Sequence, residues 1–213
     1  MKKRALISVL LCFVMTFALT GCVKVVQIGH EDEVTGNVAF NAAENVEGIW
    51  SSKAVPDIEQ NAVELPKLLT EANGKLSSVA KQYGHYSMGD KGELSYIVKG
   101  EATVTGVDQT KKAGFATLKV SGYEGPVVAK LQVGPVYKGS AVRDCLSFIK
   151  YEDYKNQVDW AKVSQAIHDV ISKDVIAPLD IANLTGKTIT FTGCFTVSGD
   201  KEILITPVTA AVK

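Results

Sequence analysis

The hydrophobic pattern of the chain changes several times, and each change predicts a different kind of element. Residues 5–19 are almost all apolar, residues 54–83 carry apolar side chains at helical spacing, and apolar and polar residues alternate from residue 93 onward. A period near 3.6 is typical of amphipathic helices, and a period of two is typical of half-buried strands. The sequence therefore predicts a short apolar segment, a small helical region and a strand-rich region.

The helical region is expected to contain two short helices. Gly74 interrupts the pattern and Gly84 is placed to end the second helix. Pro66 suits a first helical turn because it has no N–H to lose there. Trp50 precedes this region and is expected to plug its core, with an aromatic ligand platform as the alternative. The apolar positions that set the spacing are Ile58, Val63, Leu65, Leu68, Leu69, Leu76, Val79 and Ala80.

The strand-rich region predicts a fold class. Strands are expected near residues 95–107, 114–120 and 127–133, then a helix with Asn156 as its N-cap, then strands at 188–197 and 202–212. Three strands, a helix and two strands is the element order of an OB-fold.

We therefore expect an α+β protein with an OB-like five-stranded antiparallel β-barrel or a strongly curved sheet. In this expected fold, a helix lies between strands three and four, and a small helical N-terminal region precedes the barrel. An open sheet covered by one helix has the same order. The expected domains are a signal peptide (1–21), an N-terminal strand and helical region packed on the barrel (22–92) and the OB-like domain (93–213).

The start of the chain resembles a bacterial lipoprotein signal. Three basic residues precede the apolar run, which is too short for a comfortable transmembrane helix, and Leu19-Thr20-Gly21-Cys22 follows it as a lipobox. Cys22 is then the residue that carries the lipid, including a palmitate-type acyl chain, and it anchors the protein to a membrane. The alternative is an ordinary secretory signal that ends near a chance cysteine. In a host with two membranes, Val23 favours the periplasmic face of the outer membrane; with one membrane, the protein lies on its outer face.

Charge and composition exclude one class of partner. Removal of residues 1–21 takes away three of the 23 basic residues and none of the 23 acidic ones, which leaves 20 against 23. A mildly acidic chain without a cluster of Lys and Arg lacks the electrostatic footprint of a nucleic-acid binder. We expect no nucleic-acid partner.

Two of the four cysteines remain for the folded part. Cys12 leaves with the signal peptide and Cys22 carries the lipid, so Cys145 and Cys194 are left. Outside the cytoplasm such a pair can form a disulfide, but the sequence does not show that the two residues approach each other. The sequence leaves this disulfide open.

Several stretches resemble a family of bacterial predicted periplasmic lipoproteins, domain of unknown function 2291. They read GIWSSKAVP, VKGEATVTGVD, LQVGPVYKGSAVRDCLSFIKYEDYKNQVDWA and GKTITFTGCFTV. The family has no established biochemical activity, and its genes often lie near sugar-type ABC transporters. The resemblance implies an envelope lipoprotein that assists carbohydrate uptake. Cys145 and Cys194 stand where the family more usually has small or apolar residues.

One polar cluster is a candidate ligand site. Arg143, Asp144, Asn156 and Gln157 offer the directed donors and acceptors that proteins use to hydrogen-bond sugar hydroxyls. The alternative is that Arg143 and Asp144 pair locally and that Asn156 only caps the helix.

Nothing in the sequence has the pattern of a catalytic, metal or cofactor site, so we expect no enzyme, no metal and no cofactor. His30, His85 and His168 lack ligand spacing, and there is no Gly-x-Ser-x-Gly motif. The sequence leaves open a carboxylate pair for glycoside hydrolysis, because the two residues of such a pair come together only in the folded protein. The leading hypothesis is a non-enzymatic ligand-binding accessory of a sugar-type ABC transporter. The alternative is a protein-interaction lipoprotein with an apolar patch around Trp50 or Tyr123.

Overall fold

The computed structural model describes residues 41–88 and 91–213, which belong to one compact unit of the chain, Phe40–Lys213. The lipobox, Cys22 and the strand expected after it lie outside the described residues. The α-helices are α3 (Ala42–Ile49), α4 (Val55–Asn61), α5 (Leu65–Ala72), α6 (Ala80–Tyr83), α7 (Ala141–Cys145) and α8 (Gln157–Ile171). The strands are β1 (Val63–Glu64), β2 (Gly84–Met88), β3 (Lys91–Asp108), β4 (Ala113–Val120), β5 (Val128–Pro135), β6 (Thr188–Thr196) and β7 (Glu202–Val212). Shorter helical turns are η1 (Trp50–Ala54), η2 (Leu76–Val79), η3 (Tyr151–Asp153), η4 (Ser172–Ile176) and η5 (Ile181–Asn183).

Five strands close into a barrel in the order β3-β4-β5-β7-β6, with β6 returning to β3. Strand β3 is 18 residues long, and it pairs with β6 over Ser95–Thr103 and with β4 over Ala102–Asp108. The OB-like class and the helix between the third and fourth barrel strands are thus confirmed. Four of the pairings are antiparallel, whereas β5 and β7 run parallel.

The strands curve at three irregular positions. The register shifts between Val104 and Gly106, between Gly114 and Phe115, and between Thr192 and Gly193. Each shift resembles a β-bulge, which bends a strand and increases its twist. At Gly193 the two backbones come so close that an added Cβ would collide with the Thr206 carbonyl oxygen of β7. The barrel can close at this position only because the residue has no side chain.

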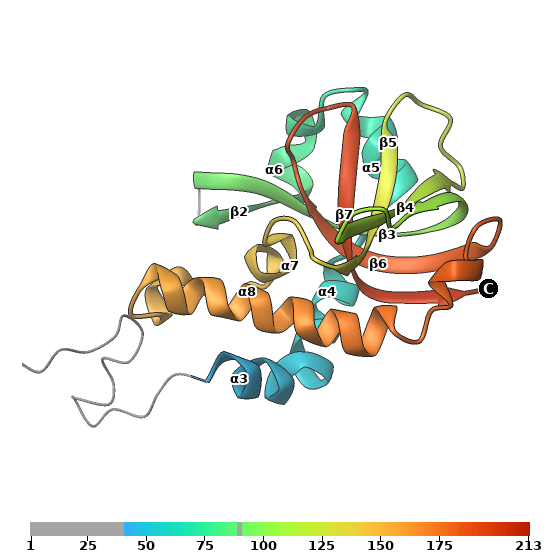
Figure 1. Ribbon diagram of the computed structural model, residues 1–213. Coiled ribbons are helices and arrows are strands. Elements are labelled where there is room, and N and C mark those ends of the chain that lie inside the picture. The colour runs from blue at the N-terminus through green and yellow to red at the C-terminus, as the bar shows by residue number, and fades with distance from the viewer. Residues whose placement is uncertain (1–40, 89–90) are drawn as a thin grey trace, which may run out of the picture. The chain divides into compact units, whose positions relative to one another are not determined.

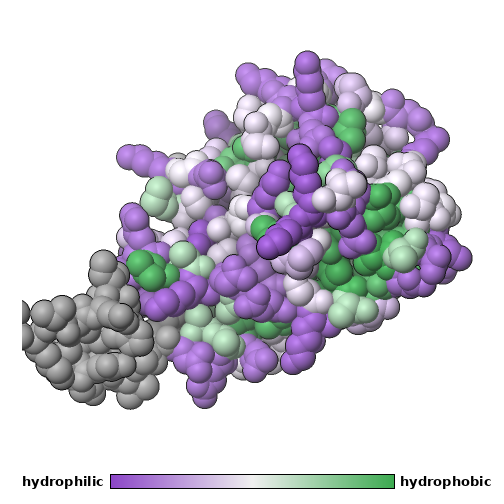
Figure 2. Space-filling model, in the orientation of Figure 1, coloured by the Kyte–Doolittle hydropathy of each residue, from purple (hydrophilic) through white to green (hydrophobic). Residues whose placement is uncertain are grey.

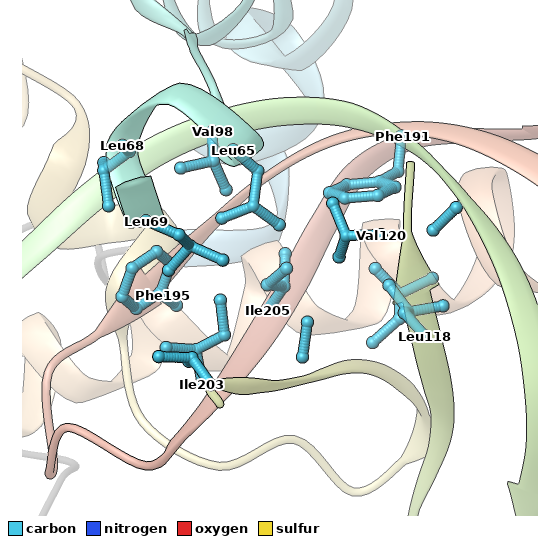
Figure 3. Packing of buried hydrophobic residues seen from close by; sticks show 14 of the residues in the cluster. Leu65, Leu68, Leu69, Val98, Leu118, Val120, Phe191, Phe195, Ile203 and Ile205 are labelled. Atoms are coloured by element: carbon cyan, nitrogen blue, oxygen red, sulfur yellow. The ribbon is translucent and has the colours of Figure 1, made fainter. Parts of the chain in front are cut away.

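The barrel interior is an apolar core that the period-two pattern predicted. Figure 3 shows side chains from β3, β4, β6 and β7 converging with leucines of α5, which covers one end of the barrel. All of them are nearly inaccessible to solvent. The residues labelled there are Leu65, Leu68, Leu69, Val98, Leu118, Val120, Phe191, Phe195, Ile203 and Ile205.

A second apolar core lies between the outside of the barrel and a layer of helices. Ile97, Cys194 and Val208 face outward from the strands and meet side chains of α3, α4, α7 and α8. Trp50 is 6% exposed in this core, so its expected role as a core plug is confirmed. Figure 1 shows α3 beside α8, with α7 between α8 and the barrel.

The helical region before the barrel is more divided than the sequence predicted. Residues 54–83 form three short α-helices and the strand β1, not two helices. Pro56 and Pro66 each lie in the first turn of a helix, and Val63 pairs with Val98 of β3 between those helices. The left-handed backbone at Asn73 and Gly74 ends α5. Tertiary pairing with the sheet therefore divides a segment that helical spacing alone would join.

Candidate functional site

Helix α7 carries a buried ion pair. Arg143 donates from Nε and Nη2 to the same oxygen, Oδ1 of Asp144, at 2.9 and 2.7 Å. The two side chains are only 9% and 1% exposed. Burial raises the pKa of the Asp144 carboxyl, and the neighbouring Arg143 charge opposes that shift. The two charged residues of the predicted cluster are thus brought together and bind each other.

Helix α8 holds the other side of the guanidinium. Arg143 Nη1 donates to the Trp160 carbonyl oxygen at 3.1 Å, and the guanidinium carbon lies 4.0 Å from the centroid of the Trp160 ring. Tyr154 and Tyr151 pack against the same indole, with ring centroids at 5.2 and 5.8 Å. Three aromatic rings and one cation therefore join α7, η3 and the start of α8.

The two amides of the predicted cluster lie at the first turn of α8. Asn156 Oδ1 accepts a hydrogen bond from the Asp159 N–H at 2.9 Å, which confirms Asn156 as the N-cap. Gln157 is the exposed first residue of the helix. Neither side chain belongs to the cavity described next, so only Asp144 of the four predicted residues lines it.

A cavity of about 640 Å³ lies between β2 and the segment that follows α7. This volume is within the range of small-molecule sites, and the lining combines aromatic rings with charged and hydroxyl groups. One wall is formed by Ala80, Lys81 and the whole of β2, which contributes His85, Tyr86, Ser87 and Met88. The opposite wall is formed by Asp144, Cys145, Leu146, Ser147, Ile149, Lys150, Tyr151, Glu152 and Trp160.

His85 gives this cavity an uncharged hydrogen-bonding group at neutral pH. Burial lowers the pKa of His85, and the negative charge of Asp57 opposes the shift only in part. Asp57 Oδ2 is itself buried without a hydrogen-bond partner among the described residues. A neutral imidazole both donates and accepts one hydrogen bond, which suits a hydroxyl-bearing ligand.

At the cavity wall, α7 and β6 bring the two remaining cysteines into one apolar core. Cys145 ends α7 and is 1% exposed, and Cys194 lies in β6 and is 0% exposed. Both thiols are free in the structure. Burial raises the pKa of the Cys145 thiol well above its usual value, and its neighbour Cys194 raises it further through a hydrogen bond and its charge.

Within residues 41–88 and 91–213, no group of three His, Cys, Asp or Glu side chains is arranged to hold a metal ion. In the same ranges, no helix combines the length and the apolar character needed to span a bilayer.

Comparison with known proteins assigns the chain to a family. The model of a family described as predicted periplasmic lipoprotein, domain of unknown function 2291, matches residues 12–210. The chain belongs to this family. The expected resemblance is therefore confirmed, and with it membership of a family described as predicted periplasmic lipoproteins. No curated protein sequence is significantly similar to this family member.

One solved structure has the same fold as this member of the lipoprotein family. A crystal structure of an OB-fold protein from Thermotoga maritima superposes with a TM-score of 0.64 at 13% sequence identity. The match covers 83% of this chain and 100% of the other. At this identity the likeness establishes the fold alone.

The β2 wall of the cavity is the part of the site that sequence reasoning missed. Its residues alternate between polar and apolar types, from His85 and Tyr86 to Ser87 and Met88, which is a strand signal. The segment is only five residues long and follows directly on α6. Its pairing with β3 places it opposite Asp144, and no local pattern could show that.

Proposed function

We propose that this protein is a non-enzymatic, membrane-anchored binding module that assists a sugar-type ABC transporter, with a sugar-like ligand in the cavity between β2 and the 144–152 segment. The observation that carries the proposal is the lining of that cavity. Tyr86, Tyr151 and Trp160 provide aromatic rings, while Ser147 and Glu152 provide hydrogen-bonding groups. Apolar faces beside a few directed polar groups are the usual composition of a small-molecule site.

Of the predicted cluster, Asp144 lies in the cavity wall and Arg143 lies behind it. The ion pair fixes the direction of the Asp144 carboxylate, and the Trp160 ring is held by the same guanidinium. Arg143 is therefore a positioning residue in this proposal. Asn156 and Gln157 contribute through the start of α8, because Asn156 fixes the first turn of the helix that carries Trp160.

The ion pair also favours binding over catalysis. A glycoside hydrolase needs two carboxyl groups that are both free to act across the bond they cleave. Asp144 and Glu152 both line the cavity, but the Asp144 side chain is 1% exposed and accepts two hydrogen bonds from Arg143. A carboxylate held in this way is not free to transfer a proton to a ligand.

The anchor is Cys22. In this proposal its lipid holds the module on the membrane where the transporter works, since two acyl chains give stable attachment. Replacement of Cys22 by Ala should move the protein from the membrane fraction to the soluble fraction after cell lysis. Retention of Cys22→Ala in the membrane fraction would count against this anchor.

The binding proposal is tested by calorimetry and thermal shift on residues 23–213 with mono- and oligosaccharides. Binding of one saccharide class in the micromolar to millimolar range is expected, and Tyr151→Ala and Glu152→Gln should weaken it at least about tenfold. Glu124→Gln is the matched control, because Glu124 is an exposed residue of the β4–β5 turn outside this cavity. No binding by any saccharide at millimolar concentration would refute the proposal.

A protein-interaction lipoprotein is the second candidate. Trp50 is buried, so it cannot anchor the expected patch, and Tyr123 packs partly against the barrel core. Tyr86 and Met88 at the cavity rim are instead 38% and 62% exposed. Figure 2 shows mostly hydrophilic side chains on the face in view, with an apolar patch on the barrel side.

Affinity capture distinguishes the two candidates. The anchored protein is isolated from detergent-solubilised membranes, with a Tyr86→Ser, Met88→Ser variant as the matched comparison. The interaction function predicts a stoichiometric partner that the double substitution removes. Recovery without such a partner would reject it.

A further inference from the structure

Two buried sulfur atoms lie where a helix meets the barrel, and the proposed binding function uses neither of them. Cys145 is the last residue of α7, and Cys194 lies on the side of β6 that faces the helices. The two side chains belong to the same apolar core, in which α7 packs against β6. They are separated by 49 positions in the sequence, so only the fold brings them together.

Two reduced thiols in the same core can be oxidised to a disulfide in an oxidising compartment. Family membership places the protein in the cell envelope, where disulfides form and persist. In the folded chain, however, both sulfur atoms are almost inaccessible, and the Cys145 thiol resists ionisation. Because the thiolate is the reacting species, oxidation must precede the closure of α7 over β6.

We propose that Cys145 and Cys194 form a structural disulfide when the exported chain folds in the envelope. The two S–H bonds break and one S–S bond forms between the sulfur atoms. The two protons and two electrons pass to a protein disulfide of the thiol–disulfide oxidoreductase class, which is reduced to two thiols. Once formed, the bond is shielded by the same burial that blocks late oxidation.

The bond would fasten one wall of the cavity to the barrel. Asp144 immediately precedes Cys145 on α7, and both line the cavity. A covalent link to β6 therefore limits the movement of α7 relative to the strands. It also closes a long loop in the unfolded chain, which is the case in which a cross-link stabilises most.

Peptide mapping of the never-reduced protein tests the disulfide directly. Cells that export the full chain are quenched in acid, and free thiols are alkylated in denaturant before digestion with trypsin. Cleavage after Arg143, Lys150, Lys187 and Lys201 places the two cysteines in peptides 144–150 and 188–201. We expect most of this material as one linked species that reductant separates.

Two controls make the result decisive. In Cys145→Ser the peptide 188–201 should be fully alkylated, and the chain without residues 1–21, retained in the cytoplasm, should be alkylated at both cysteines. If most of the exported protein is alkylated at Cys145 and Cys194, the inference is wrong. Equal linkage in the cytoplasmic chain would show oxidation after lysis and would also overturn it.

A stability measurement gives an independent readout. Reduction of the exported protein should lower its Tm by on the order of 10 °C, as expected for a cross-link that closes a loop of this length. An unchanged Tm after complete reduction would contradict the structural role. Saccharide binding is measured separately, so failure of the disulfide leaves the proposed function intact.

Discussion

Replacement of Arg143 by Ala should destabilise the protein strongly, because it leaves a buried carboxylate without its partner. The variant loses two hydrogen bonds to Asp144, one to the Trp160 carbonyl oxygen and the stacking on the Trp160 ring. Removing one member of a buried ion pair typically costs about 3–5 kcal/mol. For a domain of this size that corresponds to a fall in Tm of about 8–16 °C.

The loss of stability in Arg143→Ala should also depend on pH, and the direction of this dependence follows from the raised pKa of Asp144. Its folded pKa is raised by burial, so the folded state holds this proton more tightly than the unfolded state does. The charged carboxylate therefore costs stability above the folded pKa, and that cost is relieved as the pH falls through it. Without Arg143 the pKa of Asp144 should rise further, so the variant should recover more stability than the wild type as the pH falls from neutral toward the ordinary carboxyl range.

Urea denaturation of both proteins at neutral pH and at successively lower pH values measures these differences. Lys162→Ala is the control, because its ion pair with Asp159 is partly exposed and should cost less than about 1 kcal/mol. The reasoning would be refuted if Arg143→Ala cost no more than this control, or if its cost did not diminish at the lower pH.

Three further substitutions test separate features of the fold by the same denaturation assay. Asn156→Ala should cost about 1 kcal/mol, because it removes the cap of α8, whereas a loss below a few tenths would contradict the capping role. Gly193→Ala should cost more than about 2 kcal/mol, since its Cβ would collide with the Thr206 carbonyl oxygen, and a neutral effect would show that the strands can separate. Burial lowers the folded pKa of His168, so the wild type should lose stability as the pH falls from 6.5 toward that value. His168→Phe should lose less over this range, and identical pH profiles would exclude the contribution of the imidazole.

The strands of the barrel could be predicted because their determinants are local, whereas the closure of the barrel was not fixed by the sequence. Alternation along β4, β5 and β6 places every second side chain in the core, and the strand expected at residues 202–212 coincides with β7. The start of α8 could be predicted as well, because Asn156 caps the helix by accepting a hydrogen bond from a residue only three positions away. Periodicity and capping act over a few residues, so a single sequence records them.

The site depended on contacts that no local pattern contains. Sequence reasoning grouped Arg143, Asp144, Asn156 and Gln157 by their chemistry, but the fold turns Arg143 toward Trp160 and leaves only Asp144 at the cavity. The short helix α7 was not predicted, because five residues carry too little periodicity to identify a helix.

The sequence by itself determined the family and the order of the strands and the helix along the barrel segment of the chain, whereas the secretion signal with Cys22 stays a prediction. Only the tertiary structure decided that β2 faces Asp144 across a cavity and that Cys145 and Cys194 share one core where α7 packs against β6. The reason is physical: propensity, period and capping act between residues close in sequence, whereas a cavity wall or a pair of sulfur atoms is formed by elements that meet only when two apolar cores close.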